Sequence, residues 1–189
     1  MINKNFIKKL KENYKKNNDE RRQIISLSNV ILHESKRVIF ALHRDDLKTT
    51  KDMLAGIENI ILKLESKFGK KRLSEEGSFK AGAEEYVEAK MFFLVMSEKK
   101  IDKIKNINLG YESYLGGICD LTGELVRRAV NQAASGKLKE VEKNKEIINK
   151  IMTELVEFDM TGYLRTKYDQ ARGNLRKIEQ IDYEIKIRK

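Results

Sequence analysis

Apolar residues recur at spacings of three and four along most of the chain, the period of amphipathic α-helices. One such stripe joins Ile24, Leu27, Ile31, Val38 and Leu42. Glycines and polar clusters interrupt the pattern, and they predict helices over residues 3–17, 19–45, 47–68, 78–98, 111–135, 138–158 and 163–187. We therefore expect an all-α protein, a bundle of about six to seven helices that forms a single domain over residues 1–189.

The last predicted helix carries a regular apolar seam on one face. Its members are Leu164, Tyr168, Ala171, Leu175, Ile178 and Ile185. Charged residues occupy the other faces, so this helix packs either on its own bundle or on a neighbouring subunit. The sequence leaves both arrangements open.

The chain is strongly basic, with a formal net charge of +10 and a sequence pI of about 9.5. This charge favours an anionic partner, either nucleic acid or an anionic membrane surface, although a lysine-rich proteome would produce the same composition. No apolar run is long enough to span a membrane and no signal-peptide pattern begins the chain, so we expect a cytoplasmic protein without a membrane partner. The single cysteine, Cys119, is expected to be a small core residue. His33 and His43 have no Cys or His partner at zinc spacing.

Carboxylates interrupt two otherwise apolar helices. Glu85 and Glu88 lie three residues apart, and Asp120 and Glu124 lie four apart, so each pair occupies one helical face. Burying an ionised carboxylate costs on the order of several kcal/mol unless a cation or hydrogen bonds compensate. Glu84 is expected to point elsewhere, into solvent. The four acids therefore suggest a metal site.

Three glycines, Gly116, Gly117 and Gly123, surround the acids of the second of these helices. Each costs about 1 kcal/mol relative to alanine inside a helix, which predicts either a close backbone approach or space for a ligand.

Oxygen ligands without His or Cys favour Mg2+ or Mn2+, and the absence of an EF-hand loop gives no support to a calcium sensor. The alternative is a network of ion pairs, because Arg127 and Arg128 follow Glu124 at helical spacing. Spacing alone leaves both possibilities open. Glu34 has the same two interpretations: it pairs with Arg37, or it supplies an outer ligand to a nearby site.

Four segments, in this order, resemble the translin/Trax family. They are HESKRVIFALHR at 33–44, GAEEYVEA at 82–89, YLGGICDLTGELVR at 114–127, and residues 164–188. The resemblance covers almost the whole chain, and it implies an all-helical subunit that assembles into a hollow, barrel-like octamer with RNA inside.

The acidic residues indicate the Trax branch of the family rather than the translin branch. Trax-type subunits have a metal-dependent endoribonuclease site on residues that match Glu85, Glu88 and Asp120, with a match to Glu124 nearby as a further ligand or orienting group. Translin-type subunits bind single-stranded RNA and DNA without this aspartate, and they supply the alternative function, a non-catalytic binding oligomer. The long insertion of eukaryotic Trax is reduced here to residues 97–110, so homo-oligomerisation is the simpler expectation.

The resemblance thus predicts an Mg2+- or Mn2+-dependent endoribonuclease acting on single-stranded or duplex RNA. Weaker candidates for phosphate contact are Arg37, Arg44, Arg127 and Arg128, each of which could equally be a structural ion-pair partner.

Overall fold

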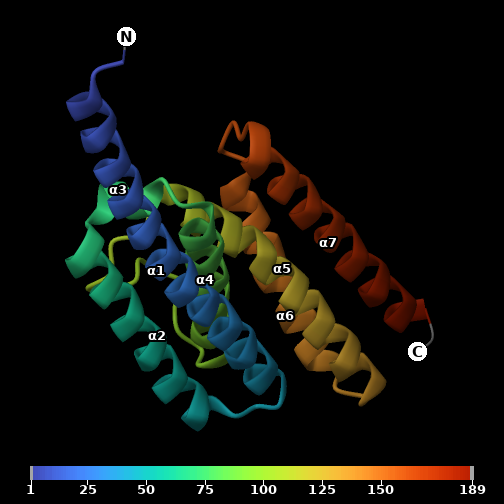
Figure 1. Ribbon diagram of the computed structural model, residues 1–189. Helices are drawn as coiled ribbons and strands as arrows, with labels where there is room; N and C mark the ends of the chain where they lie inside the picture. The colour runs from blue at the N-terminus through green and yellow to red at the C-terminus, as the bar shows by residue number, and fades with distance from the viewer. Residues whose placement is uncertain (1, 188–189) are drawn as a thin grey trace.

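Seven α-helices account for most of residues 2–187, the part of the chain that this computed structural model describes (Figure 1). They are α1 (Lys4–His43), α2 (Leu47–Phe68), α3 (Lys70–Ser74), α4 (Gly77–Met96), α5 (Tyr111–Ala134), α6 (Leu138–Leu155) and α7 (Gly162–Ile187). No strand occurs within these residues, which confirms the predicted all-α class. Met1, Arg188 and Lys189 of the predicted domain lie outside the described residues.

Helix α4 lies at the centre of the bundle, between α1 and α5 (Figure 1). Its sequence explains this position, because apolar side chains surround the helix on nearly every face. Tyr86, Met91 and Phe92 are fully buried. Helix α2 packs on α1, while α6 and α7 pack on α5. The central helix therefore carries its acidic residues into the interface with α5.

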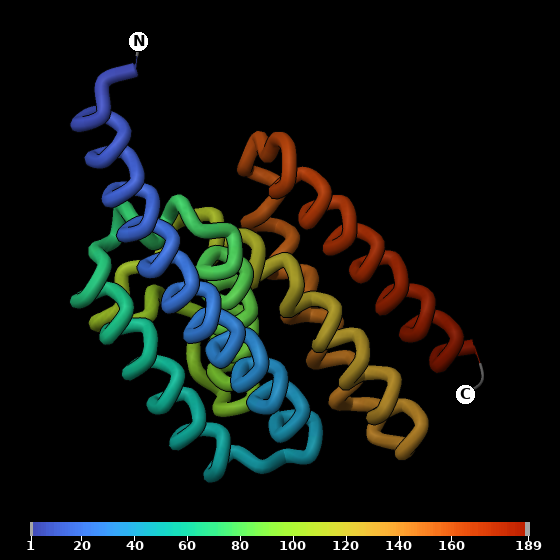
Figure 2. Tube along the Cα trace, in the orientation of Figure 1, coloured from blue at the N-terminus to red at the C-terminus, as the bar shows by residue number. Residues whose placement is uncertain are grey.

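Helix α1 is continuous, and the prediction of two helices separated near residue 18 was wrong. The segment contains no glycine or proline, and the Asn17 side chain donates to the Asn13 carbonyl one turn earlier, so nothing breaks the helix. Asn3 caps the first turn by accepting from two backbone N–H groups. Ile24 is the first buried residue of α1, and the first turns of this helix project beyond the bundle (Figure 2).

The other predicted helices agree with the structure to within three residues at each end. The short helix α3 was not predicted; it follows Gly69, whose φ of 76° ends α2. The apolar seam of α7 packs on its own bundle: Ala171 and Ile178 are buried, and the remaining seam residues lie against the same core. Within residues 2–187, no helix is both long enough and apolar enough to cross a membrane.

At Gly117 the α5 backbone lies close to the backbone of α4. A Cβ at this position would lie 2.8 Å from both the Glu84 carbonyl oxygen and the Glu88 backbone nitrogen. Both are backbone atoms, which cannot move without moving the helix. The close approach anticipated for these glycines therefore occurs at Gly117, and it sets the distance between the two acid-bearing helices.

Gly117→Ala is expected to destabilise the protein by about 1–3 kcal/mol, because the added methyl group forces α4 and α5 apart. Gly173→Ala on α7 is the matched control, since a Cβ there would meet nothing within 4 Å. Removing a helical glycine at that open position is expected to stabilise by up to about 1 kcal/mol. Urea unfolding of the two variants measures both effects, and equal free energies of unfolding would contradict the close approach.

Candidate functional site

Three glutamates of α4 lie where this helix meets α5. Glu88 is 7% exposed, the Glu84 side chain is 12% exposed, and Glu85 is partly buried. Asp120 and Glu124, one turn apart on α5, lie in the same region, with side chains 25% and 21% exposed. The structure therefore gathers the four predicted acids at one helix interface and adds a fifth, Glu84.

The expectation that Glu84 points into solvent was wrong. A Cβ at Gly116 would overlap the Glu84 carboxylate, so this glycine provides the space that the side chain occupies. Gly123, in contrast, faces Asn174 of α7, whose amide nitrogen would lie 3.4 Å from an added Cβ. Of the three glycines in α5, Gly116 makes room for an acid and Gly117 sets the helix spacing.

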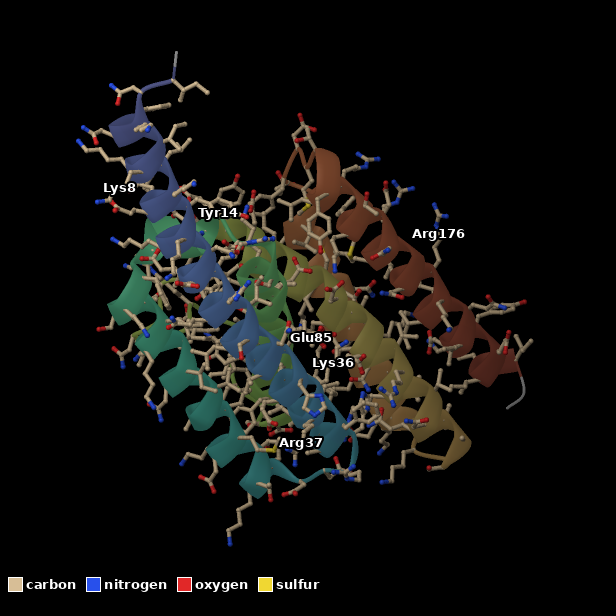
Figure 3. The ribbon with its side chains drawn as sticks, viewed as in Figure 1. Lys8, Tyr14, Lys36, Arg37, Glu85 and Arg176 are labelled. Carbon is tan, nitrogen blue, oxygen red and sulfur yellow. The ribbon has the colours of Figure 1, made fainter. Side chains whose placement is uncertain are left out.

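The buried acids destabilise one another's charged forms. Burial, and then the charges of Glu85, Asp120 and Glu124, raise the pKa of Glu88 to about 9. Burial is also the main cause that raises the pKa of Glu85; Asp120 and Glu124 add to it, while the nearby positive charge of Lys36 opposes it (Figure 3). Cations near this cluster do not neutralise it fully.

Lys167 of α7 is the principal counter-charge. Its ammonium lies 2.5 Å from Asp120 Oδ2 and 2.8 Å from Glu84 Oε1. Burial disfavours the charged ammonium, but hydrogen bonds to Asp120 and Glu84 outweigh burial and raise the pKa of Lys167 above its ordinary range. The pKa of Asp120 is nevertheless raised, because burial and the neighbouring carboxylates outweigh Lys167.

Glu124 has a partner that the sequence did not suggest. His43, at the end of α1, places Nε2 2.5 Å from Glu124 Oε2, and its ring packs on Phe92 with centroids 5.1 Å apart. Arg127 also approaches Glu124, at 3.5 Å, as the ion-pair alternative predicted. Arg128 does not; it pairs with Asp45 at 2.6 Å and lies close to the bundle.

The remaining arginine candidates lie at the surface. Arg37 pairs with Glu34 at 3.0 Å, which is one of the two arrangements considered for Glu34. Arg44 is exposed just beyond α1, and Arg127 lies over the Phe40 ring while remaining 47% exposed. Arg37, Arg44 and Arg127 are therefore accessible to a phosphate, whereas Arg128 is engaged in the fold.

The cysteine interpretation is confirmed. Cys119 is buried, and burial raises the pKa of its thiol to about 12, so the thiol stays protonated and unreactive at neutral pH.

The donors in the cluster are all carboxylate oxygens, the ligands that Mg2+ and Mn2+ prefer. Within residues 2–187, however, no three His, Cys, Asp or Glu side chains are arranged to hold a metal ion. Asp120 and Glu124 turn toward Lys167 and His43, while Glu85 and Glu88 form no ion pair with any described residue. The donor chemistry fits a hard divalent cation, and reorientation of the carboxylates, Asp120 above all, would be needed to bind one.

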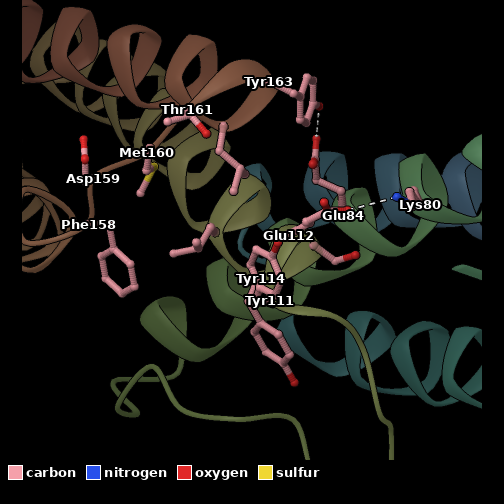
Figure 4. Close-up of a pocket in the computed structure, with 13 residues that line it drawn as sticks. Lys80, Glu84, Tyr111, Glu112, Tyr114, Phe158, Asp159, Met160, Thr161 and Tyr163 are labelled. Carbon is pink, nitrogen blue, oxygen red and sulfur yellow. Dashed lines mark hydrogen bonds and ion pairs between the residues drawn. The ribbon is translucent and has the colours of Figure 1, made fainter.

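A cleft of about 850 Å³ opens beside Glu84, between the start of α5 and the start of α7 (Figure 4). Aromatic side chains line much of it, namely Tyr111, Tyr114, Phe158 and Tyr163. The Tyr163 hydroxyl donates to Glu84 Oε1 at 2.6 Å, which connects the cleft to the acid cluster.

Sequence reasoning missed Lys167 and His43 because each reaches the cluster from a helix distant in sequence. Lys167 meets Asp120 across 47 residues and His43 meets Glu124 across 81. Helical spacing detects neighbours within one helix only, so no local signal identified either residue.

The raised pKa of Glu88 predicts a pH dependence of stability for the metal-free protein. The folded state holds the proton between the ordinary pKa of 4.5 and about 9, where the unfolded state has released it. The stabilisation is therefore complete below about pH 4.5. It declines as pH rises from about 4.5 to about 9, with a slope of up to about 1.4 kcal/mol per pH unit, and it is lost above about pH 9. Urea unfolding in EDTA measures this decline. Glu88→Gln should remove it, and an unchanged slope in that variant would contradict a protonated Glu88.

The fold and the acid cluster define an all-helical protein of the translin class. The sequence profile of the translin family matches residues 19–189, and the chain belongs to this family. It is 30% identical over 171 residues to an uncharacterised protein of Methanocaldococcus jannaschii, covering 87% of this chain and 76% of the relative. It is also 24% identical over 213 residues to mouse translin-associated protein X, covering 90% of this chain and 73% of that protein. The predicted resemblance to Trax is confirmed.

Solved structures show the same fold. Apo-NeC3PO superimposes with a TM-score of 0.84 at 23% identity, over 97% of each chain. The complex of AfC3PO with duplex RNA superimposes with a TM-score of 0.82 at 19% identity, again over 97% of each chain.

Proposed function

We propose that this protein is a metal-dependent endoribonuclease that acts on RNA as a homo-oligomer. The observation that carries the proposal is the cluster of buried carboxylates on α4 and α5. Glu85, Glu88 and Asp120 each have a raised pKa, so their charged forms are disfavoured in the metal-free protein, and a divalent cation would stabilise them.

Glu85, Glu88 and Asp120 would hold Mg2+ or Mn2+, and Glu124 would be a further ligand or an orienting group held by His43. A cation bound there would supply a Lewis acid that polarises the phosphodiester and activates water for attack. These carboxylates project from two rigid helices, which would fix the position of the cation.

RNA as the substrate is supported by the net charge of +10 and by the similarity in fold to AfC3PO, which was solved with duplex RNA. The aromatic cleft beside Glu84 could accept bases that stack on its tyrosines. Single-stranded DNA would meet the same charges and aromatic rings.

A non-catalytic, translin-type binding oligomer is the second candidate. It is favoured by the ion pair between Lys167 and Asp120, which neutralises this aspartate without a metal.

A cleavage assay separates the two functions. End-labelled single-stranded and duplex RNA are incubated with the protein in Mg2+, in Mn2+ and in EDTA. The nuclease yields internal cuts with either metal and none in EDTA. RNA binding without cuts under all three conditions would support the second candidate.

We expect a closed homo-oligomer, with an octamer as the family resemblance implies. Exposed apolar side chains on the projecting turns of α1, among them Phe6 at 60% and Leu10 at 53%, are consistent with contacts between copies. Light scattering coupled to size exclusion should give a mass about eight times the 22.0 kDa of one chain. A 22.0 kDa species at micromolar concentration would contradict an enclosed chamber.

A further inference from the structure

Lys167 lies where a cation would be needed to balance the acid cluster. Its side chain is 17% exposed, and its ammonium contacts one carboxylate of α5, on Asp120, and one of α4, on Glu84. The Tyr163 hydroxyl donates to the same Glu84 oxygen (Figure 4). The centroid of the Tyr163 ring lies 5.4 Å from the ammonium. The ammonium is thus held by two acids and one aromatic ring.

The contact with Asp120 disfavours a divalent cation on the same carboxylate. The ammonium lies 2.5 Å from Asp120 Oδ2 and occupies that oxygen. A divalent cation on either oxygen of the carboxylate would also lie close to the ammonium, and the two positive charges would repel each other. Lys167 and a metal at Asp120 therefore compete for this carboxylate.

Glu84 gives the ammonium a second position. Its Oε1 lies 2.8 Å from Lys167 Nζ, and Gly116 leaves space for this carboxylate. A lysine has a flexible four-carbon stem, so its ammonium can leave Asp120 and stay on Glu84 without movement of α7. Releasing Asp120 to the metal then leaves no buried charge unpaired.

We propose that Lys167 is a positioning residue that competes with the divalent cation for Asp120, and that Glu84 and Tyr163 hold its ammonium when Asp120 turns to the metal. The inference rests on the metal site of the proposed function. It assigns roles to Lys167 and Glu84 that are distinct from those of the ligands. Because Lys167 belongs to α7, the packing of this outer helix on α5 controls whether the Asp120 carboxylate is available to bind a metal.

Binding of Mn2+ alone to the full-length protein, measured by calorimetry at fixed pH, tests the competition. Lys167→Met should lower the Mn2+ dissociation constant by about tenfold, because Asp120 no longer has a competing cation. Lys145→Met is the matched control: Lys145 makes the same kind of contact between helices, 2.5 Å from Asp182, outside the cluster. That variant should bind Mn2+ like the wild type. A purely structural role for Lys167 would not tighten metal binding.

Removing Lys167 leaves Asp120 and Glu84 without their shared partner, which lowers the stability of the methionine variant. Lys167→Gln provides a second comparison, since its amide can still donate to Asp120 but carries no charge. It too should bind Mn2+ more tightly than the wild type.

A double-mutant cycle tests the role of Glu84. Glu84→Gln should weaken Mn2+ binding in the wild type, because the displaced ammonium loses its second carboxylate. The same change should have a smaller effect when position 167 is methionine. An equal loss in both backgrounds would mean that Glu84 acts on the metal directly, as a ligand or as a nearby negative charge, and would overturn its proposed role.

The outcomes distinguish this inference from the proposed function. If the wild type binds Mn2+ and both Lys167 variants bind it equally or more weakly, the competition is wrong while the metal site stands. If neither the wild type nor the variants bind Mn2+, the metal site itself is wrong, and the inference fails with it.

Discussion

Asp120→Asn is expected to reduce RNA cleavage by about a thousandfold or more while leaving RNA binding nearly unchanged. The amide keeps the shape of the side chain but removes the negative charge that a hard cation requires. Cleavage rates under single-turnover conditions, with Mg2+ or Mn2+, measure the effect. Glu85→Gln and Glu88→Gln should have similar effects, because the ligands of one ion act as a unit.

The ion pair of Asp120 predicts how stability responds to the same change. Lys167 keeps Glu84 as a partner, so we expect a smaller loss of stability than the removal of a sole partner would cause. Asp182→Asn is the matched control, because Asp182 pairs with Lys145 and Lys186 outside the cluster. The control should lower the melting temperature and leave cleavage unchanged.

A different result would change the assignment of the site. An Asp120→Asn protein that melts much earlier but cuts RNA at the wild-type rate when folded would reduce Asp120 to a structural ion-pair residue. The choice of the Trax-type function over the translin-type function would then fail as well.

The helices themselves were largely predictable, because each one buries a face that repeats with the helical period. The error in α1 has a clear reason. The predicted break fell at residue 18, yet a polar segment can continue a helix when no glycine or proline interrupts the backbone hydrogen bonds.

The acid cluster was predictable only in part. The spacing of Glu85 with Glu88 and of Asp120 with Glu124 places each pair on one helical face, but it gives no information about the partner helix. Glu84 joins the cluster because Gly116 of α5 leaves space for it, and Lys167 joins because α7 docks there. Both facts depend on how helices distant in sequence pack, which single-helix patterns do not contain.

The affinity for RNA is expected to fall by about a thousandfold between low and moderate salt, if the protein neutralises six or more phosphates. Each neutralised phosphate releases condensed counterions, and the net charge of +10 on every subunit supports several such interactions. Fluorescence anisotropy with labelled RNA, in EDTA to prevent cleavage, gives the slope of affinity against salt. An affinity that does not change with salt would contradict binding through phosphates.

The structure divides the four arginine candidates into a test set and a control. Arg37, Arg44 and Arg127 are accessible, so changing all three to Gln should lower the salt slope by about 0.7–0.9 for each phosphate that is no longer neutralised. Arg128→Gln is the control, because Arg128 is only 15% exposed and pairs with Asp45. It should keep the wild-type slope and lose stability instead. If Arg128→Gln lowers the slope while the triple variant does not, RNA contacts Arg128 rather than the three exposed arginines, which are then ordinary solvated charges.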